Sequence, residues 1–134
     1  MTEVEQLTFG MRRAITAGFP ETVARVKDAL KEQGFGVLTE IDVQATLKEK
    51  LGAEMPPYLI LGACNPPLAH RALTADPEIG MLLPCNVVVR GAGGGVIIEA
   101  MDPVAAMNIV ANPDVIAVAE EAKARLQRAL ETLE

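Results

Sequence analysis

Residues Tyr58 to Cys64 read Tyr-Leu-Ile-Leu-Gly-Ala-Cys, a run that is almost free of polar side chains. Such a short apolar run is typical of an inner β-strand that is covered on both faces. The chain has 134 residues and is 50% hydrophobic, so it can bury a substantial core without a metal or a disulfide. We therefore expect one domain, residues 1–134, built around Tyr58–Cys64 as a central strand.

Hydrophobic periodicity predicts further strands on both sides of this run. Leu7, Phe9 and Met11 alternate with polar residues, which predicts a first half-buried strand. A second strand is expected from Phe35 to Val43. Two more, from Pro84 to Arg90 and from Val96 to Met101, are separated by a glycine-rich segment, residues 91–95, that indicates a hairpin turn.

Helix signals lie between these strands. Gly18-Phe19-Pro20-Glu21 resembles a helix start, and Gly34 is placed to end that helix. A short helix is expected between Asp42, as its N-cap, and Gly52. Four pairs of Asn or Asp followed by Pro indicate further helix starts, because the side chain accepts a bond from an orphan amide and proline has no amide to leave unpaired. These pairs are Asn65-Pro66, Asp76-Pro77, Asp102-Pro103 and Asn112-Pro113, and the last one begins a long helix.

Together these elements predict an α+β fold, an antiparallel sheet with two main helices packed on one face. The other sheet face would then be uncovered. In the last two strands that face carries a mixed set of side chains, Asn86, Val88, Arg90, Ile97 and Glu99. A partly apolar open face suits packing against a second subunit, so we expect a homodimer.

Charge and composition exclude several classes of function. The net charge of -6 argues against nucleic acid, and 3% aromatic residues with no Trp argue against base-stacking surfaces. No apolar run approaches the roughly 20 residues that span a bilayer, and residues 1–6 do not resemble a secretory signal. We expect a cytoplasmic protein without membrane partners, whose two cysteines are thiols.

The candidate site lies around the two cysteines. Cys64 closes one predicted strand and Cys85 opens another, so the two sulfurs would lie at the same end of the sheet if these strands are antiparallel neighbours. His70 follows within the next helix, and Cys64, His70 and Cys85 could hold zinc, copper or haem iron. Each cysteine is followed by an asparagine, and we expect Cys64, Asn65, Cys85 and Asn86 to contact any small ligand.

Plainer interpretations stay open for the same residues. Both cysteines can be small buried side chains, and His70 a partly exposed helix residue. Asn65 can be a helix cap, and Asn86 can satisfy backbone groups at the strand entry. The preferred function is small-ligand or metal binding without catalysis. The alternatives are an interaction protein that works through its open sheet face and, third, an enzyme with a cysteine nucleophile.

Three stretches carry a family resemblance. They are Gly-Phe-Gly-Val-Leu-Thr-Glu-Ile-Asp at residues 34–42, Gly-Ala-Cys-Asn-Pro at 62–66, and Ile-Gly-Met-Leu-Leu-Pro-Cys-Asn-Val-Val-Val at 79–89. With Met101-Asp102-Pro103, the chain resembles the prokaryotic family known as domain of unknown function 302 over nearly its whole length. The resemblance implies a curved antiparallel sheet with two main helices on one side, as in the TATA-binding protein, and a homodimer. It implies no established activity.

Overall fold

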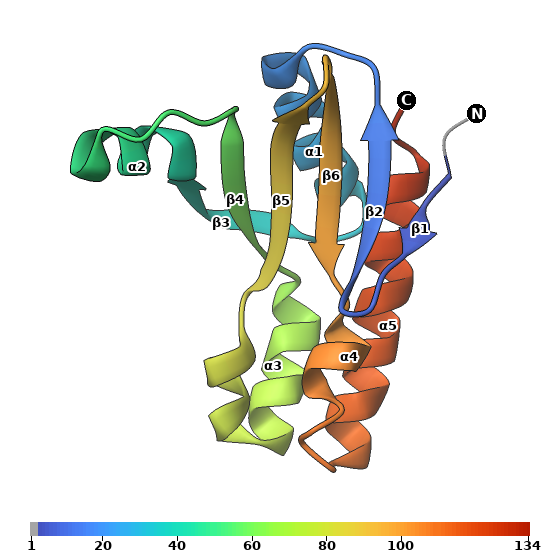
Figure 1. The fold of residues 1–134 in the computed structure, drawn as a ribbon. Coiled ribbons are helices and arrows are strands. Elements are labelled where there is room, and N and C mark those ends of the chain that lie inside the picture. Colours follow the sequence, from blue (N-terminus) through green and yellow to red (C-terminus); the bar gives the residue numbers. More distant parts are fainter. Residues whose placement is uncertain (1–2) are drawn as a thin grey trace.

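Six β-strands form one antiparallel sheet in a computed structural model that describes residues 3–134 (Figure 1). The strand order is β1-β2-β6-β5-β4-β3. The strands are β1 (Glu5–Gln6), β2 (Gly10–Ile15), β3 (Gly36–Asp42), β4 (Tyr58–Cys64), β5 (Cys85–Ala92) and β6 (Gly95–Met101). Strand β4 pairs with β3 and β5, which confirms that it is an inner strand. The expectation that β4 is covered on both faces is wrong, because Tyr58 and Ile60 are half-buried on the open face.

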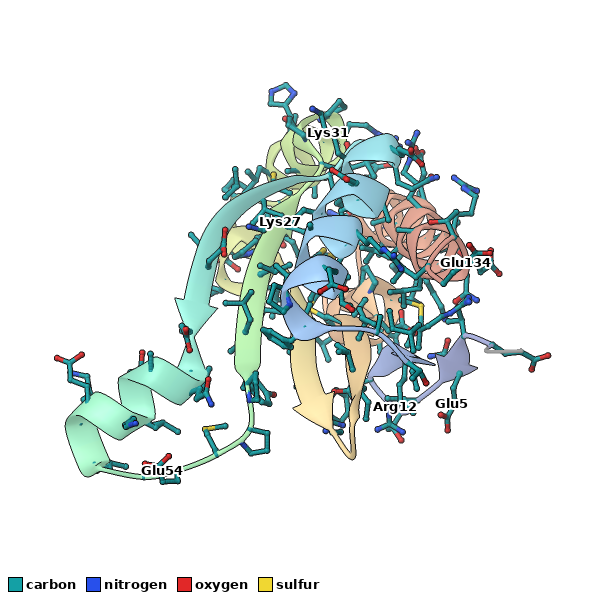
Figure 2. All side chains as sticks on the ribbon, turned by 90° about the horizontal axis from the view of Figure 1, so that it is seen from above. Glu5, Arg12, Lys27, Lys31, Glu54 and Glu134 are labelled. Carbon is teal, nitrogen blue, oxygen red and sulfur yellow. The ribbon has the colours of Figure 1, made fainter. Side chains whose placement is uncertain are left out.

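The helices confirm the predicted α+β fold. They are α1 (Phe19–Glu32), α2 (Val43–Leu51), α3 (Pro66–Ala75), the short 3-10 helix η1 (Pro77–Leu82), α4 (Pro103–Met107) and α5 (Pro113–Glu131). Helices α1 and α5 lie behind the sheet, whereas α3 and α4 lie below it, beside the lower part of α5 (Figure 1). Helix α2 projects away from the other helices in both views (Figures 1 and 2).

Local capping fixes where the helices begin. All four Asn-Pro and Asp-Pro pairs start a helix, and in each the Asn or Asp side chain accepts a bond from a backbone amide. For example, the Leu68 amide donates to Asn65 Oδ1 at 3.3 Å, and the Val104 amide donates to Asp102 Oδ1 at 2.9 Å. The cap satisfies an amide that has no partner within the helix. The four predicted helix starts are thus confirmed.

Strands β5 and β6 form the predicted hairpin. Gly93 and Gly94 occupy the two turn positions with φ values of 55° and 83°. Positive φ at both positions is the geometry of the type I′ turn, which only glycine, asparagine and aspartate adopt readily. The glycine-rich segment is therefore a hairpin turn.

The hairpin divides its side chains between the core and the open face as the alternation predicts. The core side carries Val87, Val89, Val96, Ile98 and Ala100, all buried. On the open face, Glu99 Oε2 accepts a bond from Arg12 Nε at 3.0 Å and Glu99 Oε1 accepts one from Arg90 Nε at 2.8 Å. The bond from Arg90 lowers the pKa of Glu99, so this carboxylate stays charged. Arg12 also lies beside Glu5 on the β1–β2 pair (Figure 2).

The prediction for the first strand is wrong in position. The chain reverses between β1 and β2, where the Leu7 amide donates to the Gly10 carbonyl at 2.7 Å. The alternation of Leu7, Phe9 and Met11 therefore spans a turn, and Phe9 is 78% exposed. Strand β2 begins at Gly10 and turns Met11 and Ile15 to the core.

Within residues 3–134, every helix is too short or too polar to cross a lipid bilayer.

Candidate functional site

The two cysteines lie at the same end of the sheet, as predicted. Strands β4 and β5 are antiparallel neighbours in which Ala63 is paired with Cys85. Cys85 therefore shares the core face with Ala63, whereas Cys64, the next residue along β4, has the opposite parity. Even so, both cysteines line one cavity of about 330 Å³, because Cys64 is the last residue of its strand, where the chain leaves the sheet for α3.

This cavity lies between the end of the sheet and the helices below it. Its walls come from residues of β3, the ends of β4 and β5, and helices α3, α4 and α5. Small side chains leave the space open where the elements meet, namely Ala63, Ala69, Ala72, Ala119 and Ala122. Leucine, proline, phenylalanine and methionine side chains complete an almost wholly apolar lining. The cavity suits a small apolar molecule.

The polar groups of the cavity are few. Thr39, Cys64, Asn65 and Cys85 are the lining residues with a hydroxyl, thiol or amide side chain. Cys85 is 6% exposed. Burial, and secondarily the neighbouring Cys64 thiol, raise the pKa of Cys85 to about 11. Cys85 is therefore a neutral thiol at neutral pH.

Asn65 is engaged in holding the fold. Its Oδ1 caps α3, and its Nδ2 donates to the Gln33 carbonyl at 3.4 Å. The same carbonyl accepts a bond from Arg125 Nη1 at 3.2 Å, so Asn65 and Arg125 both anchor the end of α1. The helix-cap interpretation of Asn65 is confirmed, and its side chain meets the cavity while both its polar atoms have protein partners.

The structure does not bring His70 to the cysteines. His70 is exposed on α3 and is not among the residues that line the cavity. The inward face of α3 carries Leu68 and Ala72, and a residue two positions from each of them points the other way. Within residues 3–134, no three His, Cys, Asp or Glu side chains are placed to hold a metal ion together. The expected Cys64, His70 and Cys85 metal centre is therefore not formed.

Asn86 is also separated from the cavity. It is exposed and lies opposite Gly62 in the β4–β5 pairing, on the open sheet face. Cys85 and Asn86 point to opposite sides of the sheet because they are adjacent in one strand. Of the four expected ligand contacts, Cys64, Asn65 and Cys85 meet at the cavity and Asn86 does not.

Most residues of the cavity lining were missed by reasoning from the sequence. Leu38 and Thr39 reach the cavity from β3, where the pairing with β4 shifts between Val37 and Thr39. Such a bulge carries no clear signal in the sequence. Met107 reaches it from the end of α4, a helix whose start at Asp102-Pro103 was predicted. The missing step was the packing of α3 and α4 against α5, which depends on the tertiary fold.

The chain is similar to a family of unknown function and to a solved structure. The family model described as "Domain of unknown function DUF302" matches residues 11–133. The chain is also similar to the crystal structure of an uncharacterized conserved protein DUF302 from Bacillus stearothermophilus, with 32% sequence identity and a TM-score of 0.86 over 93% of this chain and 98% of that chain. No curated protein matches it. The chain therefore belongs to the family of domain of unknown function DUF302.

Proposed function

We propose that this protein binds a small, mainly apolar molecule in the cavity between the sheet end and helices α3, α4 and α5. The observation that carries the proposal is the cavity itself, with its volume of about 330 Å³ and its apolar lining. Ligand sites in proteins are typically apolar cavities of roughly 300–1,000 Å³ with a few polar groups. The two thiols and the Thr39 hydroxyl would supply those groups.

Packing supports the same proposal. Side chains around a cavity lose contacts that they would make in a filled core, and the cost grows with the cavity volume. A molecule of matching shape restores those contacts, and an apolar cavity of about 150 Å³ is already large enough to bind benzene. Ligand binding would therefore stabilise the folded protein.

Indole is a suitable probe, because it is small and apolar and the chain has no Trp to contribute background fluorescence. We expect saturable indole binding by the wild-type protein and an affinity loss of about tenfold in Ala69→Leu, equivalent to roughly 1.4 kcal/mol. Ala69 lines the cavity on α3. The matched control is Ala117→Leu at an exposed position of α5, which should bind as the wild type does. Absence of saturable binding, or equal affinity in Ala69→Leu, would overturn the proposal.

A cysteine-dependent reaction has less support than the binding of a small molecule. A nucleophilic thiol needs a depressed pKa, and burial raises that of Cys85. The burial of Cys85 thus favours a binding role over catalysis for this thiol.

We also propose that the open sheet face packs against a second copy of this chain. Along one row of that face, Val88 is paired with Ile60 and Ile60 with Ile41, and Ile41 is 50% exposed. In a two-fold dimer this apolar row would pack against the same row of the second subunit. The likeness to the TATA-binding protein fold, implied by the family resemblance, stays a prediction.

Sedimentation equilibrium tests the dimer. We expect the wild-type protein to sediment as a dimer and Ile41→Lys to shift it toward the monomer. Ile109→Lys is the control, since Ile109 is 80% exposed between α4 and α5, away from the sheet face. A monomeric wild-type protein, or a dimer unaffected by Ile41→Lys, would count against this face.

A further inference from the structure

We propose that Cys64, Cys85 and Met107, which all line the cavity, form a site for a soft monovalent cation of the Cu(I) type. The inference rests on the proposed function, because it uses the same cavity, and it names the chemistry that the cavity's sulfur groups would recognise. It replaces the metal centre expected from the sequence with a set that contains no histidine.

Three sulfur-bearing residues from three elements line this cavity. Cys64 ends β4, Cys85 begins β5 and Met107 ends α4. Met107 is 3% exposed and Cys85 is buried, so two of the three residues are shielded from water. Thiolate and thioether groups are soft ligands that select Cu(I) over the hard cations.

The other lining residues disfavour the commoner metals. In the described part of the chain, the cavity lining includes no carboxylate and no imidazole. Zinc sites usually require four Cys, His, Asp or Glu ligands or an open water position, and calcium and magnesium require oxygen ligands. The two amide and hydroxyl residues, Asn65 and Thr39, do not make such a set, and Asn65 already bonds Gln33 and Leu68.

Charge balance favours a monovalent ion. Binding would break one S–H bond and form one Cu–S bond, with the proton leaving to solvent. The resulting pair of Cu⁺ and thiolate is neutral overall, which an apolar cavity tolerates better than an unpaired charge. The second thiol and the Met107 thioether can then complete the coordination without adding charge. A divalent ion would need both thiols to lose their protons before the site reached the same overall neutrality.

The test is an anaerobic titration of reduced protein with Cu(I) in the presence of bicinchoninate, a coloured competitor. We expect the wild-type protein to withdraw one equivalent of Cu(I). Cys64→Ser and Cys85→Ser should each weaken binding by at least the roughly 10–100-fold that supporting residues of metal sites contribute. Met107→Leu should weaken it to a smaller but measurable extent. Met81→Leu is the matched control, because Met81 is 81% exposed, and it should behave as the wild type does.

A second measurement covers variants that fail to fold. Copper X-ray absorption of the loaded wild-type protein should show only sulfur neighbours. Nitrogen or oxygen neighbours, no competition with bicinchoninate, or equal binding by Met107→Leu and Met81→Leu would each overturn the three-sulfur site. Indole binding separates the two proposals. Loss of Cu(I) binding with intact indole binding rejects the copper site alone, and the converse rejects the apolar-ligand proposal alone.

Discussion

The Nζ atom of Lys123 lies 2.9 Å from the Oδ2 atom of Asp102, whose side chain is only 5% exposed. Gln6 Nε2 donates to the same oxygen at 3.0 Å, while Oδ1 caps α4. Asp102 thus ties the end of β6 to α5 and β1. Burial opposes its ionisation, but the bonds from Lys123, the Ala105 amide and Gln6 outweigh this and lower the pKa of Asp102.

The first prediction concerns pH. A carboxyl whose pKa is lower in the folded state stabilises the protein above its unfolded pKa, and this stabilisation is lost as pH falls through the folded pKa. Asp102→Asn should therefore reduce the free energy of unfolding by about 1–3 kcal/mol near neutral pH. The reduction should shrink as pH falls below the ordinary Asp pKa of about 3.9 and vanish below the lower pKa of the folded state. Urea unfolding of the wild type and the variant, near neutral pH and again below the folded-state pKa of Asp102, measures the difference in the free energy of unfolding. Glu120→Gln, exposed on α5, is the control, and an equal loss at both pH values would contradict the argument.

The second prediction concerns Gly62. A Cβ atom on Gly62 would lie 2.9 Å from Pro84 Cγ and would also clash with Thr39 Oγ1. We expect Gly62→Ala to destabilise the protein by about 1–3 kcal/mol, the usual cost of overpacking. Gly36→Ala, in the neighbouring strand, has no atom within 4 Å of the new Cβ and should cost less. Thermal unfolding of both variants makes the comparison, and equal melting temperatures would show that Pro84 moves aside.

The third prediction concerns thiol reactivity. Because the pKa of Cys85 is raised to about 11 and its side chain is buried, iodoacetamide should modify Cys85 slowly at neutral pH. Unfolding in urea should bring the rate to that of an ordinary thiol. Peptide mass spectrometry follows each cysteine separately, and the unfolded protein is the control. Rapid modification of Cys85 in the folded protein would favour the alternative of a cysteine-dependent enzyme.

The fourth prediction concerns Arg13, a buried cation that the strand pattern did not single out. Its Nη1 donates to the Leu130 and Glu131 carbonyls at 3.3 and 3.1 Å, at the end of α5, where the helix dipole favours positive charge. Arg13→Met should lower the free energy of unfolding by about 1.5–3 kcal/mol, as for hydrogen bonds to charged groups. Urea unfolding measures it. Arg25→Met removes a comparable but exposed bond to Glu134 and should cost clearly less.

Local signals in the sequence were sufficient for much of the fold. The Asn-Pro and Asp-Pro pairs act within three residues of themselves, so their helix starts could be predicted without knowing the packing. The Gly93-Gly94 turn likewise depends only on backbone conformations that glycine allows. The misplaced first strand shows the limit of this reasoning, since the same alternation at Leu7, Phe9 and Met11 fits a strand and a turn.

The candidate site could be predicted in part. Cys64 and Cys85 were predicted to lie at one end of the sheet on the condition that their strands are antiparallel neighbours, and the pairing of β4 with β5 meets that condition. Their meeting at one cavity depends on how the chain leaves β4, which strand parity does not describe. His70 was misassigned because its distance along the chain from Cys64 was considered without the face of α3 that Leu68 and Ala72 define.

Helix α2 has no buried residue and packs chiefly against β4. A helix of nine residues is too short to persist by itself in water, since isolated helices shorter than roughly 12–15 residues are marginal. Its backbone amides should therefore exchange with deuterium through local opening, long before those of α5, and without unfolding of the core. A partner that binds over α2 should therefore slow the exchange of the α2 amides and leave the exchange of the other amides unchanged.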